Sequence, residues 1–441
     1  MKKFLAIILG ALFVMSFAAS AFAIHAEIPS ETQAIVAAGS TQITLGGEIR
    51  TRGWYQKNIV AGAPTASPSG AWYDERVRLS IDAKVSPEVQ GYVQLESGAA
   101  SGSGATALTA NQQDLVTWGN FNSKLGGMNI LQAWILYKNT SLFGFGSGLK
   151  IGHMPLALGE KQFFDHTKFG DDAIVFFIDP TKELHAGLLT IKFAEGATTN
   201  NHDDIDGYVG LFTYKLDPKN TIGANYTYLN GNLGVGAGPG LKMSDVGLHA
   251  NGNVSGLGYK AEVDFQFGDI SESVKAKGYG AMVGLSYTVD PATIRASAAL
   301  GSGNKADSTD MKEFVTFLDN GVRSGLIGDP HYTLVYEYRV NATSGRRYSG
   351  LANTTYLNIG ADFTPVKDLK TSLDAFFLRA TESTGSAHGS KNAGWEVDGK
   401  VVYNMAKNLV YQVDAGYFKA GNFYEDKKGA TVLRHQITLN F

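Results

Sequence analysis

The segment Tyr259–Phe267 reads YKAEVDFQF, and its residues alternate strictly between two chemical kinds. One set consists of Tyr, Ala, Val, Phe and Phe, and the other of Lys, Glu, Asp and Gln. Successive side chains of a β-strand point to opposite faces, so this pattern predicts a strand with one apolar and one polar face. Tyr279–Tyr287 and Trp395–Tyr403 alternate in a similar way. Period two recurs along the chain and predicts an all-β protein.

The lengths of these strands and the spacing of their aromatic residues favour a membrane barrel over a soluble sandwich. A tilted strand of roughly ten residues is long enough to cross a bilayer. Tyr279 and Tyr287 lie eight residues apart on one face, as do Trp395 and Tyr403. Eight residues at about 3.3 Å, tilted by about 40°, rise by about 20 Å, close to the ~25 Å apolar band between two aromatic girdles. We therefore expect the apolar face to meet lipid and the polar face to line a water-filled interior.

Short turns alternate with long segments rich in Gly, Ser and Asn. We expect turns at Ser86–Glu88, Asp217–Asn220 and Asn404–Asn408, and long loops at 98–126 and 301–353. Short periplasmic turns and long external loops are typical of bacterial outer-membrane barrels. The chain from residue 41 to residue 441 accommodates about 18 strands, within a range of 16 to 20. The predicted fold is a transmembrane antiparallel up-and-down β-barrel.

Some of the expected strands rest on weaker patterns than others. The least regular segments counted as strands are 147–154 and 171–178. His331–Val340, inside the long loop, is compatible with a further strand pair above the membrane.

The first 23 residues have the features of a signal peptide. Lys2 and Lys3 precede the apolar run Phe4–Phe17, and Ser20–Ala23 places small residues at a cleavage site. We therefore predict three regions: a signal peptide (1–23), a periplasmic lead-in (24–40) and an outer-membrane β-barrel (41–441). Within the lead-in we expect one helical turn capped at Ser30.

The C-terminal residues of the chain resemble those of a known class of proteins. Residues 433–441 read LRHQITLNF, so that Leu433, Ile437, Leu439 and Phe441 share one face and the last residue is aromatic. This end resembles the terminal insertion signal of outer-membrane β-barrel proteins, and the alternation over 41–441 resembles a Gram-negative porin. The early segments EIRTRGWYQ and DERVRLSIDAKV also resemble the larger alginate-export-like barrels.

The resemblance implies an outer-membrane location and a set of partners. These are outer-membrane lipid and lipopolysaccharide, and the barrel assembly machinery through Phe441. It leaves a homotrimer open, because one sequence does not separate a lipid-facing patch from a subunit interface.

Charged residues on the inward face fall into two groups along the chain. Bases outnumber acids in the first half, and acids outnumber bases from residue 257 onward. Strands consecutive in sequence are neighbours around a barrel, so we predict a positive and a negative wall, with a transverse field that favours polar solutes. The alternative is that these charges only pair for stability. The predicted pore-lining bases are Arg50, Arg52, Arg76, Arg78, Lys84 and Lys150, and the acids are Glu262, Asp264, Asp374, Glu396, Asp398 and Asp414.

The third external loop is predicted over residues 155–170, followed directly by two aspartates. In general porins the third loop folds inward and narrows the channel with acidic residues. By this resemblance the predicted constriction residues are Glu160, Asp165, Asp171 and Asp172, facing Arg50, Arg52, Arg76 and Arg78. The alternative is a loop that caps the external rim.

Other kinds of chemistry have weak support in the sequence. The chain has no Cys, which excludes disulfides, thiolate metal sites and attached c-type haem. The formal net charge of −3 gives no footprint for nucleic acid. No catalytic motif is present, so we predict no enzyme, no catalytic residues and no cofactor. We predict no metal site either, and interpret the acidic segment His202–Asp206 as a solvated loop.

The sequence therefore predicts a porin, a passive outer-membrane channel for small hydrophilic solutes and ions. Two alternatives remain open. One is a substrate-selective channel, for example for an anionic oligosaccharide or polysaccharide, although the acids from residue 257 onward argue against a polyanion. The other is a barrel sheath around a periplasmic electron carrier, which would have to bring its own haem.

Overall fold

The computed structural model describes residues 34–38, 41–59, 69–97, 116–117, 128–139, 143–195, 204–231, 240–318, 331–337 and 350–441. Within these residues 22 strands join in one sheet, and four of them are short additions to its wall. The short strands are β1 (Ala34–Ala38), β5 (Val116–Thr117), β14 (Val274–Lys275) and β17 (Phe317–Leu318). The long strands that form the wall are β2 (Thr41–Lys57), β3 (Ser69–Lys84), β4 (Val89–Ser97), β6 (Met128–Asn139), β7 (Gly146–Ala157), β8 (Phe164–Asp179), β9 (Leu184–Ala194), β10 (Ile205–Asp217), β11 (Asn220–Gly231), β12 (Leu241–Val254), β13 (Leu257–Ser271), β15 (Tyr279–Val289), β16 (Ala292–Gly301), β18 (Thr354–Val366), β19 (Leu369–Ala380), β20 (Asn392–Ala406), β21 (Leu409–Ala420) and β22 (Gly429–Asn440).

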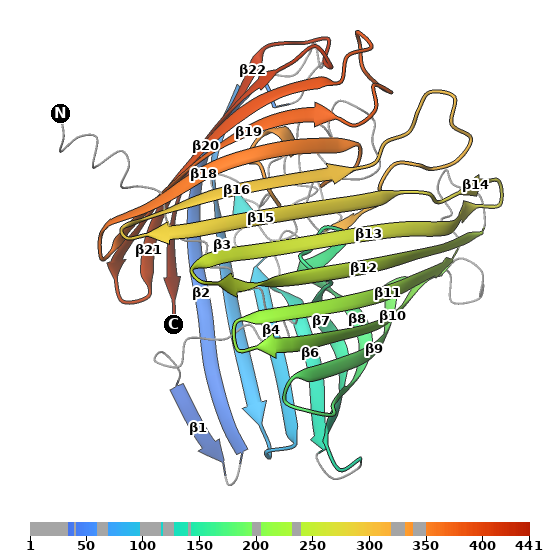
Figure 1. Cartoon of the computed structure of the whole chain (residues 1–441). Coiled ribbons are helices and arrows are strands. Elements are labelled where there is room, and N and C mark those ends of the chain that lie inside the picture. Colours follow the sequence, from blue (N-terminus) through green and yellow to red (C-terminus); the bar gives the residue numbers. More distant parts are fainter. Residues whose placement is uncertain are drawn as a thin grey trace.

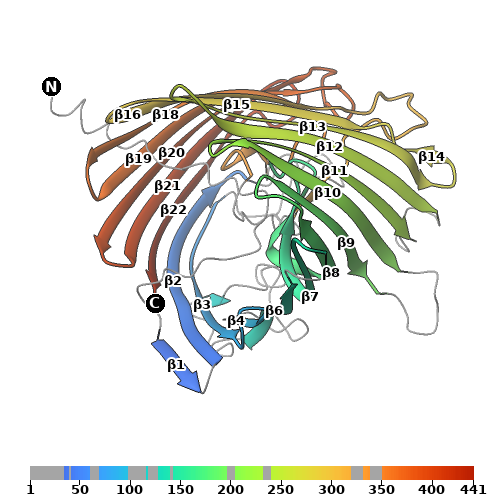
Figure 2. The same cartoon turned by 60° about the horizontal axis from the view of Figure 1, so that its bottom comes forward.

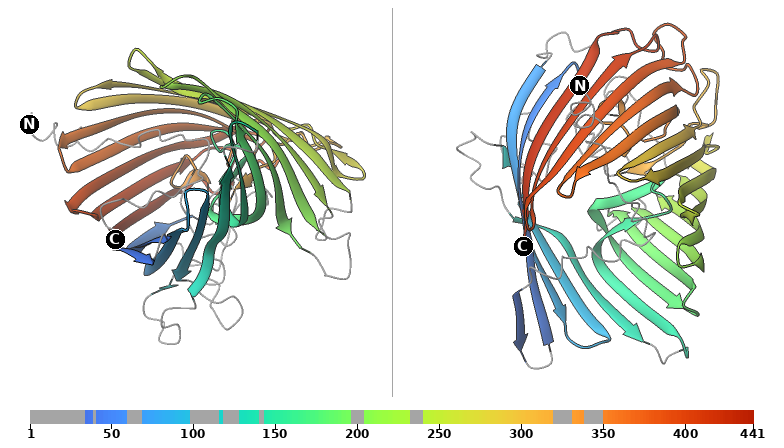
Figure 3. Two further views of the ribbon diagram at one scale, coloured as in Figure 1. Left: turned by 90° about the horizontal axis from the view of Figure 1, so that it is seen from below. Right: turned by 60° about the vertical axis from the view of Figure 1, so that its left-hand side comes forward.

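The wall closes on itself because the first and last long strands pair. β2 pairs antiparallel with β22 from Glu48 to Lys57, and each other long strand pairs antiparallel with its neighbours in sequence. The backbones of Gly47 and Phe441 exchange two hydrogen bonds, of 2.6 and 3.0 Å, and the ring of Phe441 lies where a Cβ on residue 47 would stand. The predicted closed, 18-stranded, up-and-down barrel is therefore confirmed (Figures 1 and 3).

The outward face of the wall is apolar, as the alternation predicts. In β13 the side chain of Phe265 points outward and is 52% exposed, whereas Glu262 points inward and is 3% exposed. Large apolar side chains stand exposed all around the wall, including Ile49, Leu79, Ile135, Leu188, Tyr208, Val283, Leu357 and Phe377. Such a surface suits the hydrocarbon region of a bilayer, and its strands leave no open edge within it. In the described part of the chain, no helix is sufficiently long and apolar to span a membrane.

The inward face is only partly polar, which differs from the expectation. Along β8–β13 it carries buried apolar side chains such as Ile191 and Met243, and these pack with Phe163 and Phe314 of inward-folded segments. A second buried apolar sector lies along β18–β22. There Tyr336 packs against Phe418, and Tyr332 stacks on Tyr356. Two sectors of the interior are therefore covered by chain segments that leave the wall and return into the lumen.

Several expected boundaries need correction. Within the lead-in, Ala34–Ala38 form β1, which pairs with Thr41–Leu45 of β2 and continues the line of β22 at that end of the barrel (Figure 2). The expected cap Ser30 lies outside the described residues. The segment 331–337 forms no strand above the membrane, because it lies inside the barrel against β20; residues 338–340 are outside the described part. The third loop shortens to 158–163, because β7 and β8 are longer than expected.

Candidate channel lining and constriction

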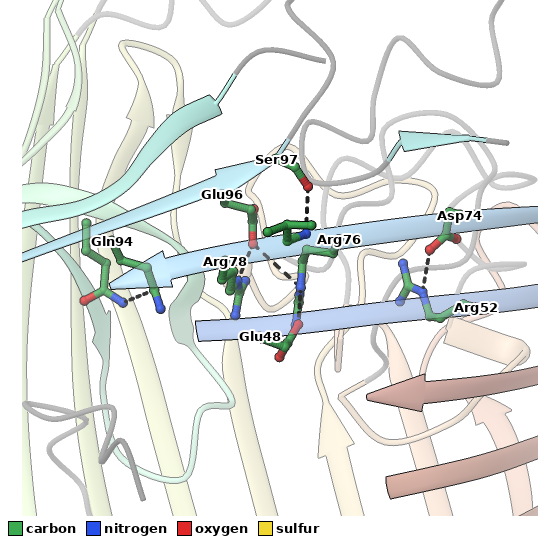
Figure 4. A network of polar contacts seen from close by, with 10 residues as sticks. Glu48, Arg52, Asp74, Arg76, Arg78, Gln94, Glu96 and Ser97 are labelled. Atoms are coloured by element: carbon green, nitrogen blue, oxygen red, sulfur yellow. Dashed lines mark hydrogen bonds and ion pairs between the residues drawn. The ribbon is translucent and has the colours of Figure 1, made fainter. Parts of the chain in front are cut away.

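The predicted basic wall lies on β2 and β3 and points inward. Arg52 donates from Nε to Asp74 Oδ1 at 2.9 Å, and Trp54 donates from Nε1 to Asp74 Oδ2 at 2.6 Å. The guanidinium of Arg52 also lies over the Trp54 ring, 5.0 Å from its centroid. All three residues are buried, so this external end of the wall is a packed, charge-compensated cluster. Figure 4 shows its Arg52–Asp74 contact.

Further along the same wall, arginines and glutamates pair between neighbouring strands. Arg76 contacts Glu48 at 2.5 Å and Glu96 at 3.9 Å, and Arg78 is ion-paired with Glu96 (Figure 4). Arg50 and Arg76 are cross-strand partners, and both are buried. Like charges directly opposite one another repel unless opposite charges stand beside them, and the glutamates here provide that compensation. The structure therefore supports the alternative that these charges pair for stability, and this pairing does not exclude a role in solute passage.

The two predicted lysines differ in their surroundings. Lys150 on β7 is buried, with its ammonium 3.9 Å from the centroid of the Trp134 ring. Burial lets such a cation–π contact offset part of the cost of removing the charge from water. Lys84 is exposed at the end of β3.

The predicted acids point inward, but most of them hold chain segments instead of standing in open water. Glu396 accepts backbone N–H groups of Val335 (2.6 Å) and Tyr336 (2.7 Å), and Asp398 accepts that of Leu334 (3.0 Å). Because a carboxylate that accepts backbone N–H groups forms charge-assisted bonds, these two residues fasten the segment 331–337 to the wall.

The remaining acids divide between paired and covered positions. Asp374 is ion-paired with Arg295 at 2.8 Å, and Asp414 with Arg434 at 2.8 Å. Asp264 has no exposed surface, and Glu262 is likewise buried. The expectation of an open acidic wall is therefore not met at these two positions, since the tip of the third loop lies against Glu262 and Asp264 is fully buried.

The third loop does fold into the lumen, but its contacts differ from those expected. Glu160 lies at its tip, where its N–H donates to Glu262 Oε2 at 2.5 Å and its carboxylate accepts from Asn251 Nδ2 at 2.8 Å. These partners lie on β13 and β12. The expectation that Glu160 faces the basic wall is wrong, because the loop folds toward β12 and β13.

The other three predicted constriction residues lie on β8 itself. Asp165 accepts from Thr167 Oγ1 at 2.6 Å, and Asp171 contacts His166 at 2.8 Å. The Asp172 side chain is 73% exposed and contacts His153, with which it shares the outward face. None of the three faces an arginine in the described contacts. Asp165 lies on the strand because β8 begins at Phe164, whereas Asp171 and Asp172 were expected where the strand begins.

A second inward segment, which the sequence did not reveal, supports the third loop. Gln266 on β13 holds Val315 through two hydrogen bonds, 2.7 Å to its carbonyl and 2.9 Å from its N–H. Phe317 then donates its N–H to the carbonyl of Phe163 at 2.8 Å, so that β17 runs parallel to the start of β8. The two inward segments thus form one unit over β8–β13.

Sequence reasoning also missed the partners of two predicted lining residues, namely Asp74, which pairs with Arg52, and Arg434, which pairs with Asp414. Asp74 stands two residues before Arg76, and Arg434 follows outward-facing Leu433. The same period-two rule places both side chains inward, so the signal was present. In the described residues no three His, Asp or Glu side chains are grouped as a metal site. Asp204 and Asp206, at the end of the acidic segment, instead pair with Lys192.

The chain matches the model of a known protein family. Residues 42–437 match the model of the family described as alginate export. The chain belongs to the alginate export family. It is accordingly an outer-membrane β-barrel of the porin-like, channel-forming class, as the sequence predicted. No curated protein matches the chain.

Solved structures of the same fold come from Pseudomonas aeruginosa. OccK5 (OpdH) is 14% identical, with a TM-score of 0.55, and the match covers 90% of this chain and 98% of that one. OpdK, solved with vanillate, is 9% identical, with a TM-score of 0.57 and the same coverage. OccK8 (OprE) is 11% identical, with a TM-score of 0.56, again over 90% and 98%. At these identities the likeness shows the fold.

Proposed function

We propose that the protein is a passive diffusion channel for small hydrophilic solutes and ions. The observation that carries the proposal is the division of the inner wall. Inward segments cover sectors of β8–β13 and β18–β22 with apolar contacts, whereas β2–β4 present arginines, glutamates and glutamines beside the buried rings of Trp54 and Tyr92. Eighteen strands enclose more space than their own side chains fill. We place the path beside β2–β4, where the wall carries its ion-paired arginines and glutamates.

The chemistry of that path favours polar solutes with a mild preference for anions. Each arginine of the wall stands near an acid, which lowers the net field, while Gln94 and Gln132 add an amide pair at 3.0 Å. Amide groups and partly compensated guanidinium groups hydrogen-bond to neutral and anionic solutes alike. An apolar solute gains nothing from this surface.

The test is planar-bilayer recording with the purified, detergent-extracted protein. We expect stepwise conductance and, in a salt gradient, a reversal potential that indicates weak anion selectivity. Membranes that incorporate the protein and stay closed would contradict the channel proposal.

A second candidate is a selective channel for an anionic oligosaccharide. The family match, with its description as alginate export, and the row of arginines on β2 and β3 favour it. Added to one side of the bilayer, uronic-acid oligomers should then block the current at lower concentrations than neutral oligomers of equal length. Equal block by both would favour the unselective channel.

We also propose that export and assembly use the two ends of the chain. Cleavage after Ala23 would leave Ile24 as the first residue of the mature protein. Phe441 would serve the assembly machinery before its ring packs over Gly47. N-terminal sequencing of the outer-membrane form checks the first point. For the second, Phe441→Ala should lower the amount of assembled barrel more than Leu439→Ala does.

A further inference from the structure

A three-by-three patch of inward positions on β11, β12 and β13 combines burial, negative charge and unpaired polar atoms. Cross-strand register aligns its rows. We call these nine positions the Gly247 patch, after the residue at their centre. Its rows are Thr227, Asp245 and Gln266; Asn225, Gly247 and Asp264; and Gly223, His249 and Glu262.

Gly247 leaves room for its neighbours to converge. A Cβ on this residue would stand 2.7 Å from both Asn225 Oδ1 and Asn225 Nδ2, and 2.8 Å from Asp264 Oδ1. The amide and the carboxylate therefore turn toward each other above Gly247, and their oxygens lie no more than about 5.5 Å apart. One Ca²⁺ ion, with oxygen ligands at about 2.3–2.6 Å, bridges a span of roughly 5 Å.

Polar atoms in this patch lack partners within the protein. Nine buried side-chain nitrogen and oxygen atoms of the Gly247 patch have no hydrogen-bond partner within the described part of the protein. They include both carboxylate oxygens of Asp264, one oxygen of Asp245, the hydroxyl of Thr227 and both amide atoms of Asn225. Asn225 is 4% exposed, so bulk water does not serve its amide. Buried polar groups without partners are rare in folded proteins.

The charges of the two aspartates in the patch also lack a basic partner among the described residues. Asp245 and Asp264 have no exposed surface, and no described residue forms an ion pair with either of them. Within the described residues, the hydrogen bond that Asp245 accepts is a 3.2 Å contact from Gln266, whose amide also holds Val315. Lys260 lies two residues before Glu262 on the same face, beyond the far row of the patch. An isolated buried carboxylate is strongly unfavourable unless a counter-charge or a proton neutralises it.

We propose that the Gly247 patch binds one Ca²⁺ ion between Asp245 and Asp264, with Asn225 Oδ1 and Thr227 Oγ1 as further ligands. Two carboxylates, an amide carbonyl and a hydroxyl are the hard oxygen donors that Ca²⁺ prefers. A set with two neutral oxygens differs from a preformed centre of three acidic or histidine side chains, and the described residues contain none of that kind.

The ion would stabilise the base on which the inward segments rest. Glu262, in the row next to Asp264, accepts the N–H of Glu160 at the tip of the third loop. Gln266, beside Asp245, holds Val315 of the second inward segment. A cation between these rows removes the repulsion among the carboxylates and fixes the strands that present both contacts.

The experiment compares the full-length, membrane-inserted wild type with Asp245→Asn, Asp264→Asn and a matched control. The control is Asp82→Asn, because Asp82 is an inward acid on β3 whose carboxylate accepts from Gln90 at 2.8 Å, outside the patch. Each protein is treated with a chelator and dialysed against micromolar Ca²⁺. Bound metal is then counted by elemental analysis, and heat resistance is followed by the change in electrophoretic mobility.

The proposal expects one Ca²⁺ per wild-type and Asp82→Asn chain, and less than a tenth of that in either patch variant. Ca²⁺ should raise the unfolding temperature of wild type by several degrees and leave the patch variants unchanged. In chelator, the double variant Asp245→Asn/Asp264→Asn should be more heat-resistant than wild type, because it lacks the repulsion; this result also shows that the variant folds. Wild type that holds no Ca²⁺ after dialysis overturns the proposal, as does metal binding that survives both substitutions. A wild type indifferent to Ca²⁺ and chelator would assign the patch to protonated carboxylates or water instead.

Discussion

The walls at β2–β4 and at β11–β13 both carry charged side chains inward, yet they neutralise them in different ways. On β2 and β3, Arg52 and Arg76 each reach an acid on the neighbouring strand. On β12 and β13, Asp245 and Asp264 have no basic partner among the described residues, and both are fully buried. The same period-two pattern produces both walls, so alternation places a charge inside but does not determine what compensates it. The charges of the first wall are neutralised by residues of its own strands, whereas the charges of the second wall need groups from outside its strands.

The largest effect on stability should come from breaking an ion pair in the wall formed by β2 and β3. Asp74→Ala removes the acceptor of both Arg52 and Trp54 and leaves the Arg52 guanidinium buried without its carboxylate. Removing one partner of a buried ion pair costs about 3–5 kcal/mol. We expect the free energy of unfolding to fall by about this amount, measured by urea titration in lipid vesicles with tryptophan fluorescence.

The matched comparison is Asp264→Ala, measured in chelator. This residue has no described basic partner to strand, so its removal should cost far less than the loss of Asp74. Equal losses for the two variants would show that the two walls do not differ in the way argued.

The next largest effect, on conductance, should come from removing the carboxylate of Glu396, which holds the segment 331–337 against β20. Glu396→Ala removes the acceptor of the Val335 and Tyr336 N–H groups. A hydrogen bond to a charged group contributes about 1.5–3 kcal/mol, so the segment 331–337 should detach from β20 part of the time. Single-channel recording should show a higher mean conductance with more frequent steps.

The control for this variant is Glu88→Ala, because Glu88 lies in an exposed turn and contacts only Ser86 through its carboxylate. Its conductance should match wild type. A Glu396→Ala channel identical to wild type would mean that the fastened segment does not limit the path.

The difference between the two walls also shows which features of the fold and the channel lining the sequence could predict. Alternation in segments such as Tyr259–Phe267 was sufficient for the barrel, its strand number and the inward direction of Arg52 or Glu262, because strand geometry is local. The contact between Glu160 and Glu262 spans 102 residues and involves a loop without periodicity. Whether a loop caps the rim or returns into the lumen depends on apolar contacts such as Phe163 with Phe317, which no local pattern encodes.

Charge reversal in the basic wall should change ion selectivity, in addition to removing the ion pairs of Arg76 with Glu48 and Glu96. Arg50→Glu combined with Arg76→Glu replaces two inward positive charges by two negative ones on cross-strand partners. A lumen field of one sign raises the local concentration of oppositely charged ions. We expect the anion-to-cation permeability ratio to fall about several-fold, read from the reversal potential in a KCl gradient. The charge-conserving pair Arg50→Lys and Arg76→Lys should stay close to wild type, and an unshifted reversal potential in the glutamate variant would refute a role for this wall in ion selection.

The smallest effect should come from Lys84, although the sequence alone grouped it with the wall arginines. Its side chain is exposed at the end of β3, beyond the paired cluster. Charges in open solution are screened over about 8 Å at physiological ionic strength, so an ion in the narrow part of the path hardly senses this ammonium. Lys84→Glu should therefore leave the reversal potential at 0.15 M salt within about a few millivolts of wild type and shift it only at low salt. A shift as large as that of the double arginine variant would place the selective region at the end of the barrel, not along the paired wall.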